Sequence, residues 1–191
     1  MLFLDANVIL DIAAHESSMR KKSDSAFPAR AHPDLLGCLS RLKSKSAKIF
    51  VTPAVLEEVF HVLWVKLLTH SKQKWACSAC APKATPDREV RRHHPSEFTA
   101  VRAATIRIFS QSITDMKKHG AHIWIPGDEP AKVGQKVMEA FLATLTRYDA
   151  VGGKDALHIA MAPLFECSAF ATRDEGFRQV EGITVYCGGH T

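Results

Sequence analysis

Four acidic residues stand far apart in the chain, each at the end of an apolar run or early in a helical pattern. They are Asp5 in MLFLDAN, Glu58 in VTPAVLEEVF, Asp155 in KDALHIAMA and Asp174 in SAFATRD. Short buried strands place their carboxyl ends along one rim of a parallel sheet, so these carboxylates are expected to meet there. Crowded like charges are unfavourable unless a cation neutralises them. The pattern therefore predicts a divalent metal held by oxygen ligands.

Each acid also has a simpler explanation, which the sequence alone leaves open. Asp5 and Asn7 are both good helix N-caps, and acids early in a helix are favoured by its dipole. Residues three and four apart share a helix face, so Glu58 aligns with the apolar Val55, whereas Glu57 lies about 100° around the helix. We therefore expect Glu58, rather than Glu57, to point at the rim.

The elements that must position these acids alternate between short apolar strands and longer helices. Strands are predicted at 2–4, 48–51, 121–125, 169–172 and 183–186. Helices are predicted from about Asn7, from Pro33, from Pro53 to about His70, across 98–116, from Pro130 and from Asp155, with Thr52 as an N-cap before Pro53. Such alternation is typical of an α/β fold with a parallel sheet.

The bulk composition is that of one soluble globular domain covering residues 1–191. The chain is 46% hydrophobic and 24% charged, with a formal net charge of +5 and a pI near 9.0. With four acids assigned to one site, the remaining surface is more basic than the total indicates, which suits a polyanion, although basic runs are also typical of plain solvated faces. No apolar stretch is long enough for a membrane span, and the first residues lack the basic region of a secretory signal.

Five scattered cysteines suit a reducing compartment better than a disulfide framework, so we expect a cytoplasmic protein. Cys77 and Cys80 have the C-x₂-C spacing of zinc ligands, and His70 with His93 could complete a Zn²⁺ site. The alternative is an exposed insertion with unpaired thiols. His158 lies three residues after Asp155 on the same helix face, where a packed core histidine is the expected role.

Taken in order, MLFLDANVIL, VTPAVLEEVF, KDALHIAMA and FATRDEGF resemble the motifs of the PIN domain, the fold of VapC-type toxin ribonucleases and related nucleases. The resemblance covers residues 1–14, 48–65 and 121–187. It implies a PIN-like three-layer α/β sandwich around a central parallel sheet, with Mg²⁺ or Mn²⁺ held by acids of these motifs. Position by position, the implied catalytic and metal-binding residues are Asp5, Glu58, Asp155 and Asp174, supported by Asn7 and Thr172.

The activity that the resemblance implies is hydrolysis of RNA phosphodiester bonds by a metal-dependent endoribonuclease. Such a protein could be the toxin of a toxin–antitoxin pair, inhibited by a protein antitoxin that covers the acidic rim, and could form a homodimer. Compact toxins of the family are shorter, so residues 15–47 and 71–118 are interpreted as mostly helical or loop insertions. The alternative is a PIN-like nucleic-acid-binding or scaffold module without catalysis, and DNA stays open as a substrate.

Overall fold

The structure, a computed structural model, describes residues 2–19, 48–74, 87–123, 130–148, 151–165, 167 and 169–186. Within these ranges the sheet has five strands in the order β3-β2-β1-β4-β5, and every neighbouring pair is parallel. The strands are β1 (Leu2–Leu4), β2 (Ile49–Val51), β3 (Ala121–Ile123), β4 (Ala169–Ala171) and β5 (Thr184–Tyr186). They lie where the apolar runs of the sequence predicted them.

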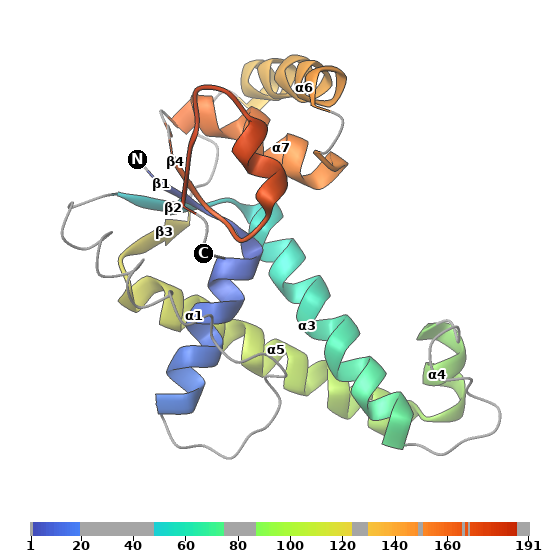
Figure 1. Cartoon of the computed structure of the whole chain (residues 1–191). Coiled ribbons are helices and arrows are strands. Elements are labelled where there is room, and N and C mark those ends of the chain that lie inside the picture. The colour runs from blue at the N-terminus through green and yellow to red at the C-terminus, as the bar shows by residue number, and fades with distance from the viewer. Residues whose placement is uncertain are drawn as a thin grey trace.

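Helices cover both faces of this sheet (Figure 1). On one face α1 (Ala6–Met19), α3 (Pro53–Lys74) and α5 (Pro95–Lys118) pack against one another. On the other face α6 (Pro130–Arg147) packs on α7 (Gly153–Met161). Shorter elements are α4 (Asp87–His93) and the 3₁₀ turns η1 (Ala162–Phe165) and η2 (Glu175–Gln179). The predicted α/β three-layer sandwich with a central parallel sheet is confirmed.

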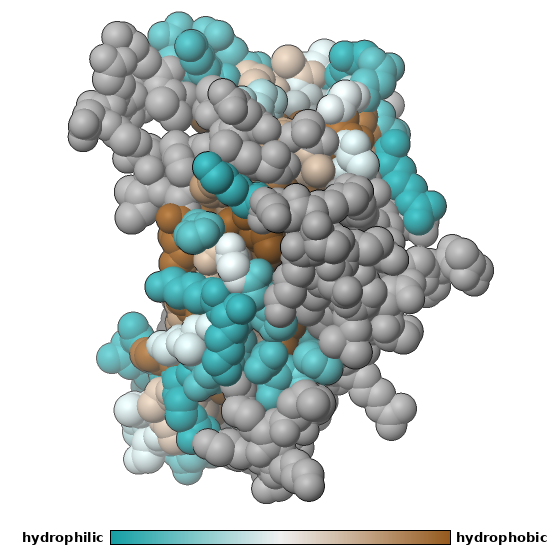
Figure 2. Space-filling model, turned by 90° about the vertical axis from the view of Figure 1, so that its left-hand side faces the viewer, coloured by the Kyte–Doolittle hydropathy of each residue, from teal (hydrophilic) through white to brown (hydrophobic). Residues whose placement is uncertain are grey.

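The core lies between these layers because the three central strands, β2, β1 and β4, are apolar along their whole length. Strand β1 occupies the middle of the sheet, and Leu2, Phe3 and Leu4 are all buried. A strand covered by helices on both faces reads as a continuous apolar run rather than an alternating one. Hydrophobic residues gather between hydrophilic surfaces above and below in the space-filling view (Figure 2). No helix in the described ranges is long and apolar enough to cross a membrane.

The predicted start of α3 is confirmed in atomic detail. The hydroxyl of Thr52 accepts a hydrogen bond from the backbone N–H of Val55 at 3.4 Å, and Pro53 is the first helical residue. Proline fits this position because the first N–H of a helix has no partner inside the helix. The helix runs to Lys74, a little beyond the predicted end near His70. This start fixes the rotation of α3 and therefore the direction of Glu58.

Helix α5 falls within the segment 71–118 that was interpreted as an insertion. Its buried side includes Val101, Thr105, Ile108 and Met116, and it contacts both α1 and α3. Residues 95–118 therefore belong to one helical layer of the sandwich. The helix predicted from Pro33 and the last two residues of the strand predicted at 121–125 lie outside the described residues.

Candidate metal centre

The strand order places the ends of β1 and β4 side by side. The chain builds the sheet from β1 through β2 to β3 in one direction, and then returns to add β4 and β5 on the other side of β1. This reversal is the kind of switch point at which open parallel sheets bind ligands, beyond the carboxyl ends of the strands. The backbone N–H of Asp5 donates to the carbonyl of Ala171 at 3.0 Å, so Asp5 follows β1 directly at that point.

The Asp5 carboxylate is buried and held by three short hydrogen bonds. Oδ1 accepts one from the backbone N–H of Ala6 at 2.6 Å. Oδ2 accepts two, from the amide of Asn7 at 2.7 Å and from the hydroxyl of Thr172 at 2.6 Å. A carboxylate has about four lone-pair sites. The three bonds fix its orientation and leave Oδ1 with capacity for a further partner.

The two predicted supporting residues, Asn7 and Thr172, tie the loop after β4 to the start of α1. The Asn7 side-chain oxygen accepts from the backbone N–H of Arg173 at 3.2 Å. The hydroxyl of Thr172 accepts from the backbone N–H of Asp174 at 3.0 Å while donating to Asp5. Both residues therefore hold the Asp5 carboxylate and the loop after β4 in place, and their supporting role in catalysis stays a prediction.

Glu58 is brought to the same place by α3. Its side chain is half-buried, whereas the neighbouring Glu57 is exposed, so the predicted choice between the two agrees with the structure. Its Oε2 lies 3.4 Å from Nε2 of His158, a residue of α7 on the opposite layer. His158 is only 2% exposed and its ring lies 5.6 Å from that of Phe3. The predicted packed core histidine is confirmed, and it also faces Glu58.

Asp155 and Asp174 complete the acidic set at greater exposure. Asp155 is the third residue of α7 and lies in its first turn, after Gly152 as the N-cap. Asp174 is an N-cap, since its Oδ1 accepts from the backbone N–H of Gly176 at 2.7 Å at the start of η2. This cap uses one of its two carboxylate oxygens.

The electrostatics show that the four carboxylates act on one another. Burial raises the pKa of Asp155 above its usual value, and the carboxylates of Asp174, Asp5 and Glu58 raise it further, against a lowering by His158. The pKa of Asp5 is also raised, chiefly by burial, with Glu58 adding to the effect. Its hydrogen bonds from Thr172 and Ala6 oppose this rise. Both shifts mean that negative charge at the rim is disfavoured as it stands.

Three groups from different elements are close enough to share one ion. Asp5, Glu58 and His158 each offer a ligand atom, and these atoms all lie within 4.8 Å of one another. Two ligands of one ion at about 2.1 Å lie at most about 4.2 Å apart, so small side-chain movements suffice to close the set. Two carboxylates and an imidazole, with the spare capacity on Asp5 Oδ1, fit a divalent cation.

Two features of the site had only weak signals in the sequence. The contact between His158 and Glu58 joins residues a hundred positions apart, although the Asp155-to-His158 spacing marked the face. Arg173 forms an ion pair at 3.1 Å with Asp11, which is buried within α1. The sequence around Arg173, RDEGF, contains no signal that predicts this pairing. The predicted zinc ligands Cys77 and Cys80 lie outside the described residues, and His70 and His93 are exposed.

No protein-family model matches this chain, and no curated protein matches it. The resemblance to the PIN domain therefore depends on the four sequence motifs alone.

Proposed function

We propose that the protein is a PIN-type metal-dependent endoribonuclease that hydrolyses phosphodiester bonds in RNA. The observation that supports this most strongly is the approach of Asp5, Glu58 and His158, which come from three separate elements and offer ligand atoms within 4.8 Å of one another. Carboxylates that repel one another are costly for the fold, and a bound divalent cation reverses that cost. A purely structural or binding module would gain nothing from such a cluster.

The residues divide into those that hold the cation and those that act around it. Asp5 and Glu58 are the nearest carboxylate ligands, with Asp155 either direct or acting through water, and Asp174 is exposed to incoming water and substrate. A bound Mg²⁺ or Mn²⁺ supplies charge neutralisation and a lowered pKa for bound water in phosphodiester hydrolysis. Asn7 and Thr172 keep the Asp5 carboxylate in one orientation through their hydrogen bonds.

A nucleic acid as the substrate is supported by the charge of the whole chain. The net charge is +5 although the site itself is acidic, and Arg91, Arg92 and Lys117 are exposed. A basic surface attracts a polyanion toward an acidic site that is neutralised by its metal. The toxin, antitoxin and homodimer assignments stay predictions. A small overlapping reading frame immediately upstream would support the first two.

The decisive experiment compares two adjacent glutamates of α3. Glu58→Gln removes one ligand charge with almost no change of shape, and we expect RNA cleavage in Mg²⁺ or Mn²⁺ to fall at least about a hundredfold, the scale of a positioned catalytic group. Glu57→Gln is the matched control, because Glu57 is exposed and one residue away; its rate should equal that of the wild type. Cleavage is followed on a fluorescent single-stranded RNA, with and without EDTA.

Two outcomes would contradict the proposal. Equal cleavage by the wild type and by Glu58→Gln would show that the activity does not come from this site, and points to a contaminating ribonuclease. Absence of cleavage by the wild type with every divalent metal and with both RNA and DNA would favour the binding-module alternative. Cleavage of DNA alone would keep the site and change the substrate.

A further inference from the structure

Of the three residues Asp5, Glu58 and His158, only His158 has no role in a magnesium site built from oxygen ligands. It is 2% exposed, and its ring lies beside Phe3 under the carboxyl edge of the sheet. Nε2 faces Glu58 Oε2 at 3.4 Å, which is long for a hydrogen bond. A buried imidazole this close to two carboxylates requires an explanation beyond packing.

The second nitrogen of the ring supplies an independent observation. Nδ1 of His158 is buried and has no hydrogen-bond partner among the described residues. Buried polar groups are nearly always paired with protein, water or ions. Among the described residues, neither ring nitrogen therefore makes a short hydrogen bond, and Nε2 is the nitrogen that faces the Glu58 carboxylate.

We propose that His158 is a direct metal ligand through Nε2, and that this nitrogen makes the site prefer a first-row transition-metal dication to Mg²⁺. Mg²⁺ takes oxygen ligands and keeps several waters. Imidazole favours first-row transition metals, whose affinities for nitrogen-containing sites rise from Mn²⁺ through Co²⁺. Asp5, Glu58 and His158 present two oxygens and one nitrogen within 4.8 Å of one another. This mixed donor set is the kind that favours a first-row transition-metal dication.

This inference rests on the proposed function only in using the same site, and it is tested without measuring activity. Wild-type protein loaded with Mn²⁺ is examined by pulsed electron paramagnetic resonance for coupling to a ¹⁴N nucleus of a directly bound imidazole. We expect such coupling in the wild type and its loss in His158→Gln. The wild-type spectrum alone tests the proposal if the variant does not fold.

Affinities measured by isothermal titration calorimetry give the second readout. In His158→Gln we expect Co²⁺ to bind at least about tenfold more weakly, the loss typical even of a group that only orients a ligand, while Mg²⁺ binding changes little. His119→Gln is the matched control, since His119 is a half-buried histidine that contacts a carboxylate, that of Glu16, outside the cluster. Its Co²⁺ affinity should equal that of the wild type.

The outcomes separate the two proposals. Metal-dependent cleavage without nitrogen coupling, and with equal Co²⁺ affinity in His158→Gln, overturns the role of His158 and leaves the nuclease intact. Nitrogen coupling without cleavage of any nucleic acid supports the role of His158 and overturns the nuclease. Failure of Mn²⁺, Co²⁺ and Mg²⁺ to bind the wild type overturns both.

Discussion

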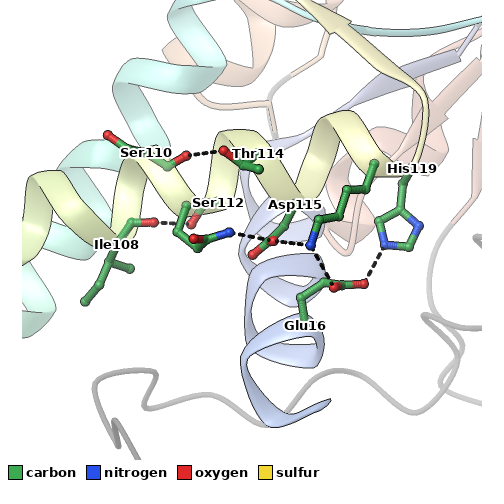
Figure 3. Close-up of polar contacts among 9 residues, drawn as sticks. Glu16, Ile108, Ser110, Ser112, Thr114, Asp115 and His119 are labelled. Carbon is green, nitrogen blue, oxygen red and sulfur yellow. Dashed lines mark hydrogen bonds and ion pairs between the residues drawn. The ribbon is translucent and has the colours of Figure 1, made fainter. Parts of the chain in front are cut away.

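Two clusters of acidic side chains lie against α1, and they are built in opposite ways. The first is the metal centre at the amino end of α1. The second, near its other end, joins Glu16 of α1 to Asp115 and His119 at the end of α5 (Figure 3). We call the second group the α1–α5 cluster. Both contain a buried aspartate, since Asp5 is 5% exposed and Asp115 is 0% exposed.

The α1–α5 cluster supplies its own cations and donors. Asp115 Oδ1 accepts from the amide of Gln111 at 3.0 Å and from Lys118 Nζ at 3.4 Å. Glu16 lies 3.7 Å from the same lysine and 3.0 Å from His119. Each acid there has a positive or donating partner within the fold, so the cluster is satisfied without a ligand.

The metal centre has hydrogen-bond donors for Asp5 and Asp174 but, among the described residues, no lysine or arginine that would neutralise its charge. Within the described part of the chain, no lysine or arginine forms an ion pair with Asp5, Glu58, Asp155 or Asp174, and the histidine that faces the cluster is His158, beside Glu58. The comparison shows that acidic content alone does not identify a metal site. What distinguishes the two clusters is whether the fold provides the neutralising charge itself, and this difference can be measured.

The largest expected effect lies in the α1–α5 cluster. Asp115→Ala leaves Gln111 and Lys118 without their acceptor and opens a gap in a fully buried position. We expect the free energy of unfolding to fall by about 2 kcal/mol, within the range for a lost buried partner. Urea denaturation measures this loss. Metal affinity should be unchanged, and a variant with normal stability but weakened metal binding would reverse the assignment of the two clusters.

A smaller effect of opposite sign is expected at the metal centre. Asp155→Asn removes a carboxylate whose pKa is raised by burial and by three neighbouring acids. Without metal at pH 7.5 the variant should be more stable than the wild type by about 0.5 kcal/mol, a modest value because solvent screens this partly exposed group. Added Mn²⁺ should reverse the order, since the wild type gains more from binding. Thermal unfolding with EDTA and with Mn²⁺ measures both.

The pH dependence of that difference follows from the direction of the shift. Below the usual pKa of an aspartate, Asp155 is neutral in both folded and unfolded chains, so the two proteins should be equally stable. As pH rises through the raised pKa, the folded wild type must lose a proton at a cost, and its stability falls relative to Asp155→Asn. Glu57→Gln, a change at an exposed acid, should show no such divergence. A pH-independent difference would assign the effect to packing.

Much of the fold could be predicted because the signals for it are local. Apolar runs of three to five residues marked every strand, and Thr52 with Pro53 marked the start of α3 to the residue. The α/β class with a parallel sheet followed from alternating elements, and the three-layer arrangement was implied by the resemblance to the PIN domain. The sequence predicts a helix within the segment 71–118, but no local signal says which layer that helix joins. The burial of Ile108 and Met116 shows that α5 belongs to the layer of α1 and α3, and it can be seen only in the folded structure, where α5 contacts both helices.

The part of the candidate site that depends on local signals could also be predicted from the sequence. Asp5 and Asp174 follow strands, so chain topology alone brings them to one edge. Glu58 could be separated from Glu57 by helix rotation. The contact of His158 with Glu58 depends on how α3 and α7 approach each other across the sheet, and the pairing of Asp11 with Arg173 depends on the path of a loop. Neither of these two contacts can be predicted from the spacing of residues along the sequence.

The smallest effect tests how closely the site is fitted, using two adjacent glycines before Asp155. A Cβ added at Gly152 would lie 3.3 Å from Asp155 Oδ2, whereas one added at Gly153 would meet nothing within 4 Å. Gly152→Ala should therefore displace the carboxylate by a few tenths of an ångström and weaken Mn²⁺ binding about threefold, given that about 1 Å of misplacement costs about a hundredfold in catalysis. Gly153→Ala should bind Mn²⁺ as the wild type does. Equal affinities in calorimetry would show that Asp155 reaches the metal only through water, which tolerates such a shift, and would leave Asp5, Glu58 and His158 as the direct ligands.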